Sequence, residues 1–559
     1  MSLLVYKILG EIRSLLKKNI YSGTLRLMRG NVANSYQKLK EILTRNFYFI
    51  DMSNNPVIPA VVLIMFSLLM IYFAFLRWPC LIDDAFITLT YSKNIVLGRG
   101  FVYNYGEPTY GSTSPLLVLI GAALGVLLPW LPLHLLVTLF TALCAIGIGW
   151  ILLIFHRQFR ISPWIAVFMG SAVIIASDPV FLGMESFLFQ FLLVLSCTQA
   201  FRKRYLSCGV CIALLHLTRA EGVLLLPVLM LYVCVSDFNK GERDIYNLFR
   251  PLLRMALGAG VVAGIWTCYA YITFGRITPN TFSAKITALE YTGKGLDFRA
   301  SWLLYVNNRF KDWGGFFNVY NVFGVMIWSL AGLGIYDIVR YRRRWIIFLL
   351  YALAYIIGYS IINIGFHRWY GLPLVLILIL SMVLGGARLA GRVLASQRKI
   401  LMVGMILTVT ILFLGVEIYR GVGQSSRKWM DPRAPTYLKV ASWLRSNTEP
   451  GSSVSIGEIG YIGYFTDNKI VDLVGLVSPE VVPFLAKGDT VGGFMMYKPD
   501  YHILIEGCPF SEPILKHPFF IENYTQVACI RGPKPREKMY IYKRKQEICS
   551  FNSCVKNSI

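Results

Sequence analysis

Apolar segments of about 20 residues recur along most of this sequence, and short polar or basic runs separate them. The first runs from 57 to 76, which is long enough for a helix to cross the hydrocarbon core of a bilayer. Hydrophobic residues make up 56% of the chain and charged residues only 15%, whereas soluble domains carry roughly 25% charge. The sequence therefore predicts a polytopic α-helical membrane protein.

The positive charge of the chain follows the membrane segments rather than one compact patch. The net charge is +25, and its basic residues cluster in short runs such as 202–204 and 340–344. Such runs mark cytoplasmic loops under the positive-inside rule, so we expect no nucleic-acid partner. Residues 1–55 form a basic extension without the form of a cleavable signal peptide, and we expect it to lie on anionic membrane lipids.

Segment length and loop charge together predict a transmembrane domain over 56–419 with about eleven helices. The segment 115–131 is short, and a full crossing there would place the basic turn 156–160 outside. We therefore expect it to be an outer-leaflet or re-entrant helix. The predicted spans are 57–76, 134–155, 163–178, 187–201, a hairpin over 205–236 that turns at 218–222, 255–274, 321–338, 346–364, 372–386 and 400–418.

The composition becomes polar from about residue 420 onward. Short β-like runs at 453–456, 469–472, 501–504 and 539–542 alternate with glycine, proline and asparagine. This pattern predicts a small extracytoplasmic α/β domain over 420–559. Four cysteines fall within it, and an even number permits disulfides in an oxidising compartment; they are Cys508, Cys529, Cys549 and Cys554.

The predicted outer face gathers most of the informative charged residues. Asp83 and Asp84 follow the first span and open a helical pattern that should end near Gly98, within a first outer loop over 77–114. Further candidates recur at later outer ends: Glu185, Arg219, Glu221, Arg276, Lys285, His367 and Arg368. Carboxylates suit general-base or metal-binding roles, and the cations suit a phosphate.

Each candidate also has an ordinary structural interpretation. Asp83 or Asp84 is a favoured residue for a helix N-cap. Arg219 and Glu221 would form a buried ion pair, and Arg276 and Lys285 would be solvated loop charges. The remaining three would be an interfacial polar residue and two snorkelling cations: Glu185, His367 and Arg368.

Several of these motifs resemble the bacterial GT-C glycosyltransferases, in particular the mycobacterial terminal β-arabinofuranosyltransferase group. The resemblance begins with DDAFITLTYSKNIVLGRGFVYNYGEPTYGSTSP at 83–115 and continues at GMES, TRAEG, GRITPNTFSAK and HRWYGLP. It extends to GEIGYIGYFTDNKIVDLVGLVSP at 457–479 and KPDYHIL at 498–504. Thr90 and the Thr218–Ala220 run depart from the pattern of these relatives, which leaves the donor sugar open.

The resemblance implies an inverting glycosyltransferase, transferring a hexose or pentose from a polyprenyl-phosphate donor to a glycan, lipid or protein acceptor. It implies Asp83 and Asp84 as the catalytic pair, with Asp83 as the preferred general base, in a bacterial inner membrane with its site outside. No cofactor is required; a divalent metal is possible. The alternatives are a lipid or sugar transporter, or a non-catalytic scaffold of envelope assembly. Ionisable residues near the middle of the membrane would favour transport.

Overall fold

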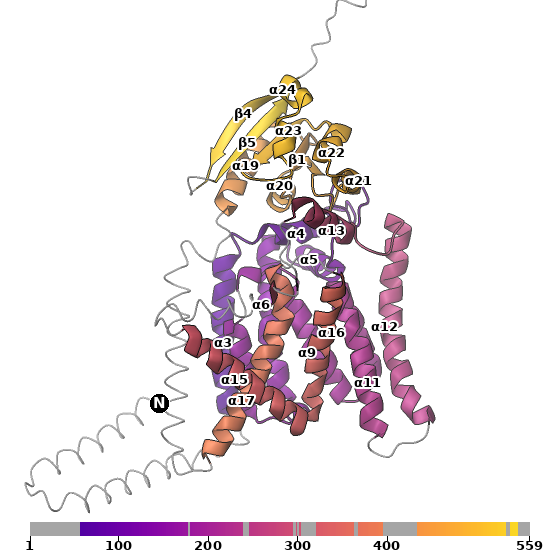
Figure 1. Cartoon of the computed structure of the whole chain (residues 1–559), viewed down its shortest axis with the longest axis vertical. Coiled ribbons are helices and arrows are strands. Elements are labelled where there is room, and N and C mark those ends of the chain that lie inside the picture. Colours follow the sequence, from indigo (N-terminus) through magenta and orange to yellow (C-terminus); the bar gives the residue numbers. More distant parts are fainter. Residues whose placement is uncertain are drawn as a thin grey trace, which may run out of the picture. The chain divides into compact units, whose positions relative to one another are not determined.

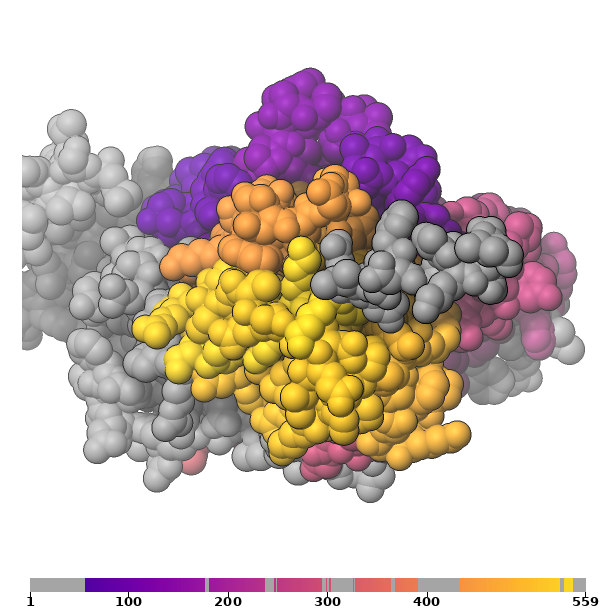
Figure 2. All heavy atoms as spheres, turned by 90° about the horizontal axis from the view of Figure 1, so that it is seen from above, coloured from indigo at the N-terminus to yellow at the C-terminus, as the bar shows by residue number. Residues whose placement is uncertain are grey.

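A computed structural model describes residues 56–176, 179–238, 245–293, 298, 301–302, 320–362, 367–394, 433–532 and 537–545. The chain divides into two compact units, Met1–Pro59 and Ala60–Ile559, and nearly all described residues belong to the second. Within that second unit, long apolar helices pack into a bundle, and an α/β domain covers one end of the bundle (Figures 1 and 2).

Helices occupy ten of the eleven predicted spans. The eleventh, 400–418, lies outside the described residues, so the total of eleven stays a prediction. The helices are α3 (Val57–Arg77), α6 (Leu133–Ile154), α8 (Pro163–Ala176), α9 (Ser186–Phe201), α10 (Tyr205–Thr218), α11 (Leu225–Phe238), α12 (Ile245–Phe274), α15 (Tyr320–Arg340), α16 (Ile346–Ile362) and α17 (Leu372–Leu394). Short helical turns join them: α7 (His156–Phe159), η1 (Pro179–Phe181), η2 (Ala220–Leu224), η3 (Arg343–Trp345) and η4 (Arg368–Gly371).

Five helical stretches among the described residues are long and apolar enough to cross a membrane: Val57–Arg77, Leu133–Ile154, Phe249–Phe274, Arg343–Ile362 and Arg368–Ala390. Close backbone contact joins two of the longer helices, α15 and α17. A Cβ atom on Gly334 would lie 1.7 Å from the Ser381 carbonyl oxygen, so this crossing requires glycine. Small residues at such crossings are typical of helix packing in membranes.

Three short helices lie outside the long spans. α4 (Asp83–Val96) begins at the paired aspartates, and Gly98 follows its end with a positive φ of 73°, as the sequence pattern predicts. α5 (Pro115–Leu127) has 13 residues and is about 20 Å long, and its place as an outer-leaflet or re-entrant helix stays a prediction. α13 (Asn280–Thr292) lies in the predicted outer loop 275–320, where the sequence analysis placed no helix.

The C-terminal domain contains a five-stranded sheet in the order β2-β1-β3-β5-β4. β1 (Ser453–Ile456) pairs in parallel with β2 (Lys469–Asp472) and β3 (Tyr501–Ile505), and these strands confirm three of the predicted β-like runs. β5 (Lys538–Arg544) confirms the fourth and pairs antiparallel with β3 and with β4 (Tyr524–Arg531), which was not predicted. The domain's helices are α19 (Ala434–Asn447), α20 (Gly460–Phe465), η5 (Pro479–Val481), α21 (Val482–Leu485), α22 (Thr490–Tyr497), α23 (Glu512–Leu515) and α24 (Pro518–Asn523).

Candidate active site

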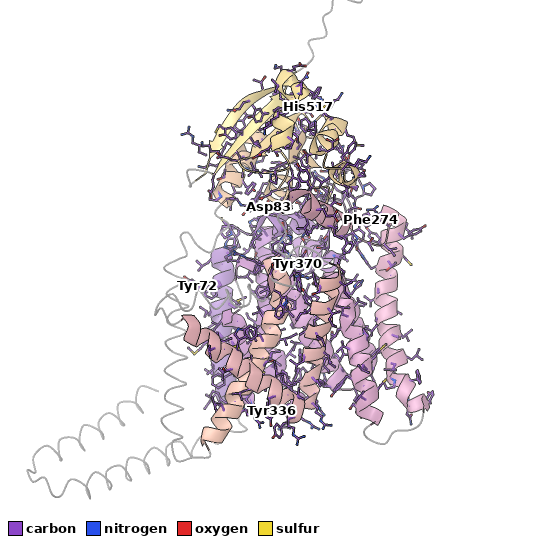
Figure 3. The ribbon with its side chains drawn as sticks, viewed as in Figure 1. Tyr72, Asp83, Phe274, Tyr336, Tyr370 and His517 are labelled. Carbon is purple, nitrogen blue, oxygen red and sulfur yellow. The ribbon has the colours of Figure 1, made fainter. Side chains whose placement is uncertain are left out.

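Asp83, the first residue of α4, connects that helix to the C-terminal domain. Its side chain is buried, and its two carboxylate oxygens accept hydrogen bonds from the backbone N–H groups of Gly460 and Tyr461, each at 2.9 Å. These N–H groups begin α20, where a helix has unpaired donors and favours negative charge. Asp83 therefore caps a helix, as the simpler interpretation allowed, but that helix is α20 and not its own helix α4. Figure 3 shows Asp83 at the boundary of the two regions.

The approach of α4 to α20 is close and well bonded. A Cβ atom on Gly460 would lie 1.9 Å from the Asp83 carbonyl oxygen, so a larger residue would push the two elements apart. Tyr103 donates to the Ile459 carbonyl at 2.7 Å, and Tyr461 donates to the Leu81 carbonyl at 2.6 Å. Asp83 thus sits within a dense interface that fixes the position of its neighbour, Asp84.

Burial raises the pKa of Asp83 from 3.8 to about 8, with the Glu458 and Asp84 carboxylates adding to the shift and the Tyr461 and Gly460 N–H groups opposing it. At a pH between these two values, Asp83 is protonated in the folded state and ionised in the unfolded state. Stability should therefore fall as the pH rises from about 4 and level off above about 8. We expect thermal unfolding midpoints of the purified protein to fall through this range.

The Asp83→Asn variant provides the control, because its amide cannot ionise. It should show a smaller fall in unfolding midpoint with rising pH than the wild type. Its midpoint at neutral pH should also be lower, because the amide nitrogen cannot accept a hydrogen bond from a backbone N–H group, whereas either oxygen of the protonated carboxyl group can. An identical pH dependence in the two proteins would assign the effect to other groups.

Asp84 faces a cavity, in contrast to Asp83. The cavity has a volume of about 320 Å³, and its lining is mostly apolar. Five of the nine predicted site residues line it: Asp84, Glu185, Arg219, Glu221 and Lys285. They come from segments far apart in the sequence, namely α4, the start of α9, the turn between α10 and α11, and α13.

Lys285 is the cation nearest to Asp84. Its ammonium nitrogen lies 4.0 Å from the Asp84 Oδ2 atom and 5.5 Å from the centre of the Trp369 ring. Burial favours the neutral amine, but Tyr370 and the carboxylates of Asp84 and Glu185 outweigh that effect and raise the pKa of Lys285. The cavity therefore places a carboxylate and a charged ammonium group beside each other.

Arg219 is held by the protein on all sides. Its Nε atom lies 2.6 Å from Glu221 Oε1, its Nη1 atom donates to the Trp369 carbonyl at 3.1 Å, and its Nη2 atom donates to the Tyr359 hydroxyl at 3.3 Å. Glu185 lies 3.8 Å from the same guanidinium group, so one cation is shared by two carboxylates. This geometry favours the buried ion-pair interpretation and leaves Lys285 as the cation with fewer protein partners.

Aromatic side chains complete the wall beside Arg219, and the sequence analysis did not select them. Tyr359 donates to Glu221 Oε1 at 3.0 Å. The ring centre of Tyr370, which is labelled in Figure 3, lies 4.9 Å from the Arg219 guanidinium carbon. Tyr351, Tyr355 and Tyr359 recur every four residues on α16, a spacing that puts them on one face of the helix. That spacing was the available signal, but the chain contains 32 tyrosines, so these three did not stand out.

The C-terminal domain contributes one part of the cavity wall. Leu476 lines the cavity beside Gly111 from the first outer loop. Its loop is fixed by the buried Asp472, whose side chain accepts hydrogen bonds from the N–H groups of Val474, Leu476 and Val477. The predicted tail motif thus supplies a rigid loop to the cavity, although none of its residues was selected as a site residue.

Three other predicted site residues do not line the cavity, although His367 contacts Trp369, which does. Arg276, His367 and Arg368 are exposed, and the His367 ring stacks on Trp369 with a centroid distance of 4.6 Å. Cys508 and Cys529 are free thiols, whereas Cys549 and Cys554 fall outside the described residues. In the part of the chain that the structure describes, no group of three histidine, cysteine, aspartate or glutamate side chains is arranged to hold a metal ion.

Comparison with solved structures defines the class of fold. ArnT from Cupriavidus metallidurans, solved with undecaprenyl phosphate, matches 86% of this chain and 97% of its own at 12% identity, with a TM-score of 0.52. The Archaeoglobus fulgidus oligosaccharyltransferase, in complex with zinc and sulfate, matches 79% of this chain and 68% of its own at 13% identity, also with a TM-score of 0.52. Both are GT-C glycosyltransferases, so this membrane protein has the GT-C fold.

Sequence comparison adds one match. Residues 424–546 match a family described as a domain of unknown function, DUF8728. This segment contains the whole sheet and the α20 helix that binds Asp83. No curated protein matches the sequence.

Proposed function

We propose that this chain is a glycosyltransferase that moves a sugar from a polyprenyl-phosphate donor to a hydroxyl-bearing acceptor. The observation that carries the proposal is the pairing of Asp84 with Lys285 in one cavity of a GT-C fold. Two solved relatives support a lipid-phosphate donor and a separate acceptor, since ArnT was solved with undecaprenyl phosphate and the oligosaccharyltransferase was solved with a tethered acceptor peptide.

The edge of the cavity suits a lipid-borne donor. Three of its lining residues are large, apolar and between 46% and 48% exposed: Val223, Phe282 and Ile362. They come from η2, α13 and the end of α16. A polyprenyl chain lying in the bilayer would contact this apolar edge, while its phosphate would reach the polar end at Lys285.

Asp84 is the general base in this proposal. Its carboxylate removes the proton of the acceptor hydroxyl as the acceptor oxygen attacks the anomeric carbon of the donor. The bond between that carbon and the phosphate oxygen breaks, and polyprenyl phosphate leaves. Direct attack inverts the anomeric configuration. Asp83, which the resemblance favoured as base, instead has both carboxylate oxygens engaged by α20 and acts as a positioning residue.

Lys285 stabilises the negative charge that grows on the leaving phosphate. We expect Lys285→Met to lower kcat/KM by about 10²–10³, a typical loss when one electrostatic donor is removed from a transition state. Lys285→Arg should retain part of the activity. The exposed Lys439 lies in the C-terminal domain, and Lys439→Met provides a matched control. Unchanged kinetics in Lys285→Met would remove this residue from the site.

Deletion of the gene tests the proposed function itself. Lipid extracts from the deletion strain should accumulate one polyprenyl-phosphate sugar, and mass spectrometry of that lipid would identify the donor. Re-expression of the wild-type protein should remove it, whereas the Asp84→Asn variant should not. Unchanged lipid-linked sugars in the deletion strain would contradict the proposal. We also propose that the protein lies in a bacterial inner membrane with the cavity on the outer side.

A further inference from the structure

A second, strongly basic pocket lies at the other ends of the helices that line the active-site cavity. Its volume is about 820 Å³. Six cations and a single carboxylate line it: Arg160, Lys203, Arg340, Arg342, Arg343 and Arg344, together with Asp337. We call this space the basic pocket.

Helix lengths place the basic pocket across the membrane from the active-site cavity. α9 starts beside Glu185 at the cavity and ends at Phe201 in the basic pocket, and its 16 residues span about 24 Å. α16 runs the opposite way, from Ile346 in the basic pocket to Ile362 at the cavity, over about 25 Å. Figure 3 shows Tyr336, near this pocket, far below Asp83. The positive-inside rule then predicts a cytoplasmic position.

The protein supplies little negative charge to balance these cations. Asp337 is buried and already binds two arginines, with its Oδ2 atom 2.6 Å from Arg342 Nε and its Oδ1 atom 2.6 Å from Arg388 Nη1. Arg344 is held by the Gln158 carbonyl oxygen at 2.5 Å. The other four cations, Arg160, Lys203, Arg340 and Arg343, are exposed and have no ion pair among the described residues, so an anion could bind them without first displacing a carboxylate.

The rim of the basic pocket is apolar as well as charged. Val235, Val339 and Tyr341 line it and are 51%, 54% and 58% exposed, respectively. Val235 lies near the end of α11, and Val339 lies in the last turn of α15, where those helices leave the membrane. A soluble anion would gain nothing from these side chains, whereas the acyl chains of a lipid would cover them.

We propose that the basic pocket binds the phosphate headgroup of an anionic phospholipid from the cytoplasmic leaflet. Basic pockets between membrane helices on this side are suited to such headgroups, and the negative surface potential of the leaflet adds to the attraction. The pocket joins three turns, those between α7 and α8, between α9 and α10, and between α15 and α16. A bound headgroup bridges these turns and holds the helix ends together.

The test compares lipid binding by purified protein in a neutral detergent, measured by native mass spectrometry. Wild-type protein should bind phosphatidylglycerol at least about tenfold more tightly than phosphatidylcholine with the same acyl chains. The triple variant Arg160→Gln, Lys203→Gln and Arg343→Gln should lose this preference. A matched control, Arg157→Gln, Arg204→Gln and Arg254→Gln, changes exposed cations that do not line the pocket and should keep it.

Three results would overturn the proposal. Equal binding of the two lipids by the wild type would remove the preference for an anionic headgroup. An equal loss in the control variant would show a general effect of net charge. Competition by glycerol 1-phosphate at concentrations comparable to the lipid would identify a soluble phosphate compound as the ligand. Thermal unfolding midpoints of both triple variants establish that the fold is intact.

Discussion

Replacement of Asp84 by asparagine should reduce sugar transfer by about 10²–10⁴, because an amide cannot accept the proton of the acceptor hydroxyl. The side chain is 36% exposed and asparagine has nearly the same shape, so the thermal unfolding midpoint should change little. The measurement is the initial rate of transfer, with the lipid-linked sugar that accumulates in the deletion strain as donor. Loss of rate without loss of stability would distinguish a chemical role from a structural one.

Two control variants test whether the loss of transfer is specific to Asp84. Asp467→Asn removes an exposed carboxylate, 62% accessible, that lies outside the cavity lining, and transfer should be unaffected. Asp83→Asn should lower stability at the contact with α20, and any loss of transfer should follow that loss of stability. If Asp84→Asn turns over normally while a stable Asp83→Asn protein is inactive, the general base is Asp83.

Replacement of Arg219 by methionine should be the most destabilising of the substitutions considered. Arg219 is 4% exposed and lies between Glu221 at 2.6 Å and Glu185 at 3.8 Å. Its removal leaves two nearly buried carboxylates without their cation, and breaking such a pair costs about 3–5 kcal/mol. The fall in thermal unfolding midpoint measures this effect.

The double variant Arg219→Met with Glu221→Leu separates a structural pair from a phosphate ligand. Because the guanidinium donors already have partners within the protein, we expect the second substitution to restore most of the stability and much of the transfer rate. Recovery should be incomplete, since Glu185 keeps its charge. A double variant that is stable yet inactive would instead show that Arg219 contacts the donor phosphate.

Most helices and strands could be predicted from the sequence, because their formation depends mainly on residues that are close together in the chain. Apolar segment length predicted ten of the helices, and short β-like runs between glycine, proline and asparagine residues predicted four of the five strands. β4 was missed because its outward-facing residues are mostly polar and exposed, so that Tyr524–Arg531 shows little apolar alternation. α13 was missed because glycine and proline precede it and its sequence is only weakly amphipathic.

The site was harder to predict, since it depends on segments that meet only in the folded chain. Sequence could place Asp83 and Asp84 beside each other on the outer side, but successive residues of a helix point in different directions. Only the position of α20 decides that Asp83 is covered while Asp84 faces the cavity. Arg276 and Arg368 were selected because they belong to the motifs GRITPNTFSAK and HRWYGLP. In the structure neither residue lines the cavity.

The bond between Asp83 and α20 also has a consequence for biosynthesis. Asp83 and Gly460 are 377 residues apart, and ribosomes add roughly 5–20 residues per second, so the partner emerges roughly 20–75 s after the aspartate. During that interval α4 lies at the membrane surface without the helix that covers it. Translation of the apolar helices thus precedes completion of the cavity, and a ribosome that stalls within the C-terminal domain should leave a protein whose cavity lacks the wall at Leu476.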